Sequence, residues 1–172
     1  MELWDIYDIH RNKIEGRTSV RGSDDMTDDE FHLVVFAAAV NDSGELLIGK
    51  RDRNKMFGGV WEFCGGSAVS GEDSKMAAMR ELYEETGLDV SDCPAKCVKE
   101  TVIKYWKGSN WFYDVWFFEC DFDVEKLTPQ EGEVELINKF SVDEVKKLLE
   151  EENFTGITGE FIDKIEKEIK KI

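Results

Sequence analysis

One segment of the sequence is typical of a helix with defined ends, and it separates two groups of strand-like runs. Residues Ser74 to Thr86 carry apolar side chains at helical spacing, and Gly87 follows in the position where glycine commonly ends a helix. The runs before and after it are rich in β-branched and aromatic residues and are divided by turn residues. Strands in hairpins, with helices between and after them, predict an α+β fold with a mixed sheet packed against helices.

The same signals place the other elements. The apolar run Phe31 to Val40 predicts a buried strand, and the turn residues 41–44 join it to a second strand at 45–50 as a hairpin. Ser141 with Glu144 three residues later has the capping-box spacing that begins a helix. The remaining expected elements are strands near 3–9, 61–64, 97–107, 111–120 and 133–140, and a last helix near 158–171. Residues 1–30 are expected to form an arm that packs on a domain of residues 31–172.

The net negative charge of the chain limits which kinds of partner it can bind. The 172 residues, about one domain's worth, include 38 acidic and 22 basic side chains, which gives a formal charge of −16. Such a surface repels nucleic acid and anionic membranes, so neither is expected as a partner. The longest apolar run, Leu33 to Val40, is too short to cross a bilayer, and the N-terminus lacks the basic and apolar regions of a signal peptide. We therefore expect a cytoplasmic protein.

The cysteines carry little functional signal. In a cytoplasmic setting we expect all four to be reduced. Cys93 and Cys97 have a loosely zinc-like spacing, but the chain has no second cysteine pair and only two histidines, so a structural zinc site is not expected. The four residues are Cys64, Cys93, Cys97 and Cys120.

Three glutamates in the central helix are costly unless something compensates their charge. Glu81, Glu84 and Glu85 stand at i, i+3 and i+4 and share one helix face, where like charges cost about 0.2–0.5 kcal/mol per pair. They also lie toward the C-terminal end, where the helix dipole disfavours negative charge. A divalent cation, which prefers oxygen ligands, would remove the repulsion, whereas the alternative is a solvated acidic face. The opposite face, expected to pack on the sheet, carries Ala78, Met79, Leu82, Tyr83 and Thr86.

These glutamates belong to a longer pattern that resembles a known family. The pattern is Gly66-x5-Glu72-x7-Arg80-Glu81-Leu82-x-Glu84-Glu85-x-Gly87-Leu88, hereafter the 66–88 motif, and it resembles the Nudix box at every defining position. The flanks are similar to the family as well: a strand ending in a basic residue at Arg51, and a Trp61 to Gly66 entry with Cys64 where proline is common. The resemblance covers about Phe31 to Glu150 and implies an α/β/α sandwich.

The resemblance also implies an activity and a cofactor. Nudix hydrolases cleave a nucleoside diphosphate linked to another group across its pyrophosphate, with Mg²⁺ or Mn²⁺. In this sequence Glu81, Glu84 and Glu85 fall on the metal-binding glutamates, with the Gly65 carbonyl beside them and Glu84 also in a catalytic role. Arg80 is expected to orient the glutamates, and Glu72 to hold the loop or reach the metal through water. The expected partner is a small diphosphate substrate.

Residues outside the motif are weaker candidates. Glu131 and Glu133 are our candidates for the general base, with ordinary loop acids as the alternative. Arg51 and Arg53 are candidates for binding a substrate phosphate, with surface charges at a strand end as the alternative. Trp106, Trp111 and Trp116 lie on the expected hairpin, where aromatic residues are more often core than ligand platforms. The arm could serve a homodimer or close over the site.

Two other functions stay open at this point. The segment 3–8 together with 31–35 looks similar to the start of isopentenyl-diphosphate isomerases, with Cys64 near the isomerase cysteine and His32 in place of a metal-binding histidine. However, the motif glutamates are intact, the other metal histidines are lacking, and Phe112 stands where a catalytic glutamate is expected. A ligand-binding Nudix sensor is the other alternative, although sensors commonly lose these glutamates.

Overall fold

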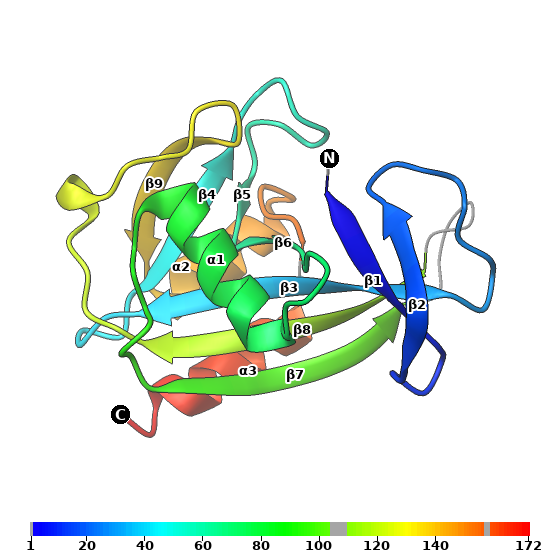
Figure 1. Cartoon of the computed structure of the whole chain (residues 1–172). Helices are drawn as coiled ribbons and strands as arrows, with labels where there is room; N and C mark the ends of the chain where they lie inside the picture. Colours follow the sequence, from blue (N-terminus) through cyan, green and yellow to red (C-terminus); the bar gives the residue numbers. More distant parts are fainter. Residues whose placement is uncertain (1, 104–109, 157–158) are drawn as a thin grey trace.

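The computed structural model describes residues 2–103, 110–156 and 159–172 and has a mixed sheet at its centre (Figure 1). The central strand β3 runs parallel to β8 over ten residue pairs and is antiparallel to β1, β4 and β6, while β9 extends the sheet beyond β4. The strands are β1 (Leu3–Tyr7), β2 (Lys13–Val20), β3 (Phe31–Val40), β4 (Leu46–Arg51), β5 (Trp61–Glu62), β6 (Cys64–Ser67), β7 (Ala95–Ile103), β8 (Asn110–Glu119) and β9 (Val134–Phe140). The predicted α+β fold with a mixed sheet is confirmed.

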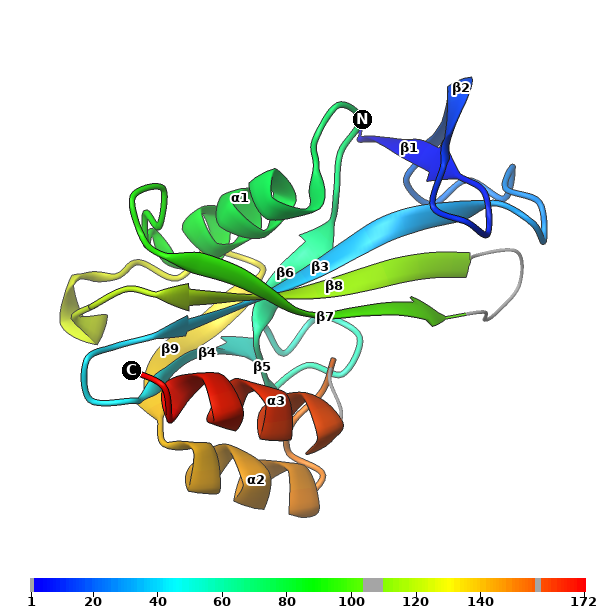
Figure 2. The ribbon, with the colours of Figure 1, turned by 90° about the horizontal axis from the view of Figure 1, so that it is seen from below.

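Helices cover both faces of the sheet. Figure 2 shows α1 (Ser74–Thr86) on one side and α2 (Val142–Glu150) with α3 (Gly159–Ile169) on the other. The period-2 geometry of β3 explains its continuous apolar run: Leu33 and Val35 point into the core under α1, whereas Ala38 and Val40 point into the core under α2 and α3. None of the helices in the described part of the chain is long and apolar enough to cross a membrane.

Most of the expected elements are present with small shifts in their ends. Helix α1 has the predicted bounds, and Gly87 ends it with a φ of 78°. The capping box of Ser141 and Glu144 begins α2. Tyr83 is the exception on α1: the prediction that it packs on the sheet is wrong, because the helix approaches the sheet through Ala77, Ala78 and Leu82 and leaves Tyr83 58% exposed beside this face. The expected turn at Gly108 and the expected helix start at Thr158 lie outside the described residues.

The first 30 residues contain an additional strand. The hairpin of β1 and β2 with its flanking turns, hereafter the N-terminal hairpin, joins the sheet through Tyr7 and Phe31. Strand β2 lies at the edge of the sheet and is mostly solvent-exposed, so its sequence lacks the apolar alternation that would have predicted it.

Hydrogen bonds and ion pairs to two buried carboxylates fix the N-terminal hairpin to the rest of the fold. Asp5 accepts hydrogen bonds from the Lys13 ammonium (2.7 Å), the Ser70 hydroxyl (2.7 Å) and the Gly71 amide (2.8 Å). At the other end of the hairpin, Arg11 donates two hydrogen bonds, 2.9 and 2.8 Å long, to the carboxylate of Asp114 on β8. The hairpin is thereby attached both to the loop of the 66–88 motif and to the central sheet.

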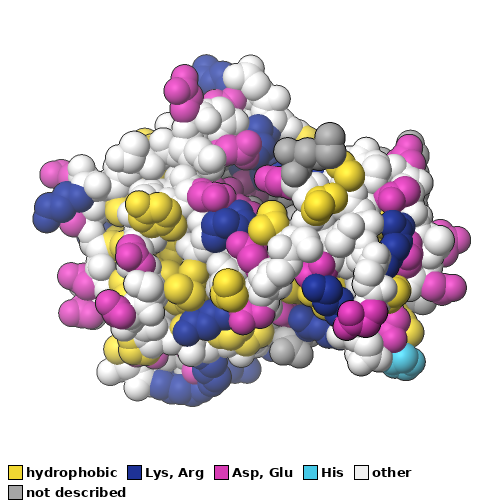
Figure 3. Space-filling view, in the orientation of Figure 1, with side chains coloured by type: hydrophobic (Ala, Val, Ile, Leu, Met, Phe, Trp, Pro, Cys, Tyr) yellow, Lys and Arg dark blue, Asp and Glu magenta, His cyan; other side chains and the backbone are white. Residues whose placement is uncertain are grey.

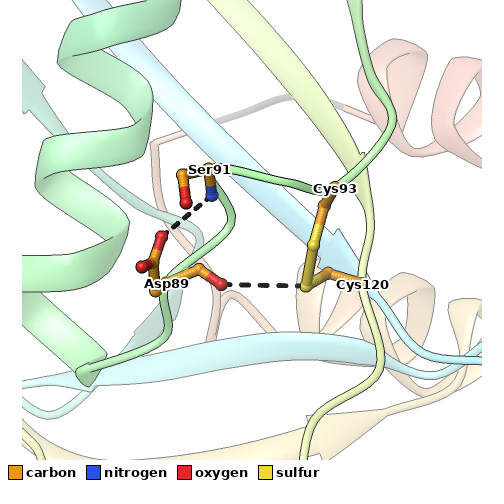
Figure 4. Close-up of a disulfide and its surroundings, with 4 residues drawn as sticks. All are labelled: Asp89, Ser91, Cys93 and Cys120. Carbon is orange, nitrogen blue, oxygen red and sulfur yellow. Dashed lines mark hydrogen bonds between the residues drawn. A yellow bond between two sulfur atoms is a disulfide. The ribbon is translucent and has the colours of Figure 1, made fainter.

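The expectation that all cysteines are reduced is wrong for Cys93 and Cys120, which form a disulfide (Figure 4). Cys93 lies two residues before β7 and Cys120 immediately follows β8. The antiparallel pairing of these strands therefore brings the two Cα atoms to 5.5 Å, within the usual range for a disulfide. This register could not be read from the sequence. Cys64, in contrast, is a buried thiol in the core under α1.

We predict that Asp114→Asn lowers the free energy of unfolding by about 1–3 kcal/mol, because the buried carboxylate, 2% exposed, holds both Arg11 and the Ser74 hydroxyl. Urea unfolding monitored by tryptophan fluorescence would measure the change. Glu151→Gln is the control, since it removes an exposed partner of Lys147 and should alter the unfolding free energy by less than about 0.5 kcal/mol. Equal stability of Asp114→Asn and the native protein would contradict the prediction.

Candidate functional site

The site forms where the C-terminal half of α1 passes over β6. Asp73 caps the helix by accepting a hydrogen bond from the Met76 amide (2.8 Å), and Leu82 anchors it in the core. With that face fixed on the sheet, Glu81 and Glu85 are turned toward the backbone of β6, and Glu84 stands at the more exposed side.

Arg80 links the carboxylates of the motif to one another. Its guanidinium donates to both oxygens of Glu72 (2.7 and 3.0 Å), and Nη1 donates to Glu81 and to Glu84, each at 2.9 Å. Nη2 also donates to the Ser67 carbonyl (3.0 Å), while Glu72 accepts from the Val69 amide (3.0 Å). The loop before α1 and the acidic face of α1 are therefore held by one cation.

Two glycines of β6 allow close approaches on this strand, Gly65 to the neighbouring strand β3 and Gly66 to a side chain of α1. A Cβ atom on Gly65 would lie 2.2 Å from the Val35 carbonyl oxygen, and one on Gly66 would lie 2.6 Å from Oε1 of Glu81. The Gly65 amide donates a 3.3 Å hydrogen bond to Glu85. A side chain at 66 would therefore displace the carboxylate of Glu81, whereas one at 65 would collide with the backbone of β3.

Burial makes these carboxylates reluctant to ionise. Burial, reinforced by the neighbouring Glu81 and Glu62 carboxylates, raises the pKa of Glu85 to about 8. Burial also raises the pKa of Glu81, and Arg80 opposes this effect. A cation placed among them would reverse the penalty, because it favours the charged form of each carboxylate.

A small polar cavity of about 100 Å³ lies over this face of α1. Figure 3 shows acidic and basic side chains side by side around a hollow in the upper middle of the molecule, between α1 and the N-terminus. The cavity is lined by Glu2, Arg21, Lys55, Gly65, Gly66, Arg80, Glu81, Glu84, Glu85, Gln130 and Glu133.

Of the four candidate residues outside the motif, the structure places one at the polar cavity and three away from it. Glu133 lines the cavity and pairs with Lys55, whereas Glu131 is an exposed residue of the neighbouring turn. Arg51 pairs with Glu62, and Arg53 pairs with Glu135; neither arginine is among the cavity-lining residues. Their predicted roles in substrate binding are thus not supported by their positions here.

The donor set fits a divalent metal ion, although its oxygens are engaged in other contacts. Within residues 2–103, 110–156 and 159–172, no three acidic, histidine or cysteine side chains are already arranged as a metal site. Arg80 accounts for this, because it holds the carboxylates of Glu81 and Glu84. Mg²⁺ and Mn²⁺ prefer hard oxygen ligands, which the carboxyl groups of Glu81 and Glu85 supply. Gly66 leaves space beside Glu81, and Glu85 is buried next to it.

A second, mostly apolar pocket of about 610 Å³ adjoins the polar cavity, and Arg21 lines both. Trp111, one of the tryptophans expected on the hairpin, lines this pocket, whereas the sequence carries no signal for the contributions of Trp4 and Arg21, because nothing in an arm-like segment indicates which side chains return to the site. Trp106 lies outside the described residues. The pocket is lined by Trp4, Arg21, His32, Val34, Phe36, Met56, Ser67, Trp111, Tyr113 and Gly156.

The residues that resemble an isomerase site are packed as core. The Cys64 side chain is 1% exposed, and burial first and then the charge of Glu85 raise the pKa of its thiol. The His32 ring stacks on Trp4 with centroids 4.0 Å apart, and its Nδ1 atom is buried without a hydrogen-bond partner among the described residues. Burial lowers the pKa of His32 to about 4. Neither side chain is placed to act as the isomerase resemblance implies.

We predict that His32→Phe flattens the acid dependence of stability. Because the pKa of His32 is 6.5 ordinarily and about 4 in the fold, the unfolded chain takes up the proton first as pH falls. The native protein should lose up to about 1.4 kcal/mol per pH unit across this window, a loss that the variant lacks. Urea unfolding of both proteins at pH 7, 5.5 and 4.5 measures the difference; parallel pH profiles would contradict it.

Comparisons with known proteins agree on the family. The NUDIX domain model matches residues 30–162. A Nudix hydrolase of Listeria monocytogenes is 36% identical over 138 residues, which cover 78% of this chain and 76% of that protein. An RNA pyrophosphohydrolase of Roseobacter denitrificans is 33% identical over 107 residues, 52% of this chain and 64% of that protein. A crystal structure from Deinococcus radiodurans has the same fold, with a TM-score of 0.72 at 16% identity over 96% of this chain and 98% of that one. The chain belongs to the Nudix family of hydrolases.

Proposed function

We propose that the protein hydrolyses the pyrophosphate bond of a nucleoside diphosphate derivative with Mg²⁺ or Mn²⁺. The observation that carries the proposal is the single network in which Arg80 gathers Glu72, Glu81 and Glu84 beside the close approach of Glu85 to Gly65. A structural acidic face would be solvated, whereas Glu81 and Glu85 are largely buried against the backbone of β6. Burying several carboxylates together is costly unless a cation compensates them.

Each residue of the network has a role in this mechanism. Glu81, Glu84 and Glu85, with the Gly65 carbonyl, would hold the metal, and Glu72 with Arg80 would keep these carboxylates in position. The bound metal would neutralise the diphosphate and lower the pKa of the attacking water. Glu133, which lines the same cavity and pairs with Lys55, is the candidate general base that would take the proton of the attacking water.

The adjoining pocket supports a nucleoside as the substrate's organic part. Its lining includes the aromatic residues Trp4, Trp111 and Tyr113, which make this wall apolar and suited to packing against a base. The Roseobacter relative is named an RNA pyrophosphohydrolase, and another relative, from Proteus vulgaris, an 8-oxo-dGTP diphosphatase. Both names describe the cleavage of a phosphoanhydride attached to a nucleoside, which agrees with a polar cavity beside an aromatic pocket.

We predict that Glu85→Gln lowers metal-dependent kcat at least ~100-fold while the fold persists, because the amide cannot supply the charged oxygen that a divalent ion prefers. The assay is phosphate release from a panel of nucleoside diphosphate derivatives with Mg²⁺ or Mn²⁺, coupled to pyrophosphatase and phosphatase. Glu160→Gln on α3 removes the same charge far from the cavity and should leave turnover unchanged. Full activity of Glu85→Gln would refute the metal assignment. Isopentenyl diphosphate is added to the panel, with NMR to detect double-bond migration.

We predict a separate loss of activity without a loss of stability for Gly66→Ala. The new methyl group would meet the carboxylate of Glu81, a flexible side-chain end that can move away at little energetic cost. Moving it removes an oxygen from the proposed metal site, so kcat should fall at least ~10-fold while the thermal midpoint changes little. Gly159→Ala is the control, because no atom lies within 4 Å of its Cβ position. Unchanged turnover in Gly66→Ala would count against Glu81 as a ligand.

A further inference from the structure

Most of the cationic side chains that line the polar cavity form ion pairs with carboxylates. Arg80 holds the glutamates of the motif, and Lys55 pairs with Glu133. Arg51, which precedes the same loop as Lys55, pairs with Glu62. An incoming diphosphate therefore meets few cationic groups whose donors are available to it.

Arg21 differs from these cations in its position and in its partner. It follows the last residue of β2 and is the one residue that lines both the polar cavity and the aromatic pocket in the described part of the chain. The structure records one side-chain hydrogen bond for it there, from Nη1 to Glu2 at 2.7 Å, and both side chains of this pair are about half exposed, at 59% and 45%. Exposed ion pairs of this kind are weak, so the guanidinium can exchange Glu2 for a phosphate, whose geometry matches its fork of donors.

The backbone that carries Arg21 is well fixed. The Arg21 amide donates to the Glu2 carbonyl at 3.0 Å, and the Ser70 amide donates to the Leu3 carbonyl at 2.7 Å, which ties the hairpin to the loop of the 66–88 motif. Together with the contacts of Asp5, these bonds hold the end of β2 at the rim of the cavity. The N-terminal hairpin lies almost wholly outside the Nudix match at residues 30–162, so this cation is an addition to the matched domain.

We propose that Arg21 binds a phosphate group of the substrate at the junction of the two cavities, and so determines which diphosphates this enzyme accepts. This proposal rests on the proposed function for the reaction itself, but it concerns binding by a residue outside the motif. The diphosphate lies between the glutamates and Arg21, and the group attached to it extends from Arg21 into the aromatic pocket. A substrate whose phosphate is placed elsewhere relative to its ring loses this contact.

Equilibrium binding tests the proposal independently of turnover. Isothermal titration calorimetry in MgCl₂ would measure the Kd of two probes that resist hydrolysis, methylenediphosphonate and α,β-methylene-ADP. Arg21→Ala should weaken both probes at least tenfold, and Arg21→Lys should recover part of the loss. Lys170→Ala, which removes one exposed positive charge immediately after α3, should leave both affinities within twofold of the native values.

Glu2→Gln distinguishes a binding role from a structural one. If the Arg21–Glu2 pair only holds the hairpin, breaking it from either side weakens the probes equally, and that result would overturn the proposal. If Arg21 binds phosphate, Glu2→Gln keeps or improves affinity because it removes the competing carboxylate. Native-like binding by Arg21→Ala, or no binding of either probe by the native protein, would also overturn it.

The two proposals can fail separately. Arg21-dependent binding in a protein that hydrolyses nothing on the panel would leave the present inference standing and remove the proposed function. Metal-dependent hydrolysis whose KM is unchanged in Arg21→Ala would support the proposed function and overturn the role of Arg21.

Discussion

The contacts of Arg80 are the constraint on which the rest of the site depends. One guanidinium joins the loop glutamate Glu72 to Glu81 and Glu84 on the helix, so the loop and the helix cannot move independently. The repulsion that makes three clustered glutamates costly in an isolated helix is thereby partly compensated before any metal ion arrives. The same contacts keep the carboxylates from forming a closed ligand set, which leaves room for a cation to be bound together with its substrate.

Glu85 differs from the other motif glutamates in its burial and in its lack of a recorded contact with Arg80. It is buried beside Gly65 and is not among the recorded partners of Arg80, so its charge is left uncompensated and its pKa rises to about 8. A carboxyl group in this state gains most from a nearby cation, because ionisation and cation binding become favourable together. The two glycines make this arrangement possible, since a Cβ atom at 66 would meet the carboxylate of Glu81 and one at 65 would meet the Val35 carbonyl oxygen of β3.

The sequence predicted local features much better than distant contacts. Helix α1, its Gly87 end and the capping box at Ser141 depend on spacings within a few residues, which a sequence displays directly. The pairing of Cys93 with Cys120 depends on strand register, and strand β2 is an exposed edge strand without apolar alternation, so neither had a readable signal. The motif glutamates were identified through spacing and resemblance, whereas Glu2, Arg21 and Lys55 enter the cavity from segments that no local pattern connects to it.

This difference has a physical basis that bears on substrate choice. In the proposed function, residues of the 66–88 motif act on a group that every diphosphate shares, so one short segment with fixed spacing can supply them. The part of a substrate that distinguishes it from other diphosphates would lie in the aromatic pocket, whose side chains come from the N-terminal hairpin, the strands β3 and β8 and the loop that carries Met56. Because the hairpin is attached to the motif loop through Asp5, Ser70 and Gly71, a change in one region alters the position of the other. Under the two proposals made above, substrate specificity would therefore depend on the position of the hairpin relative to the motif loop.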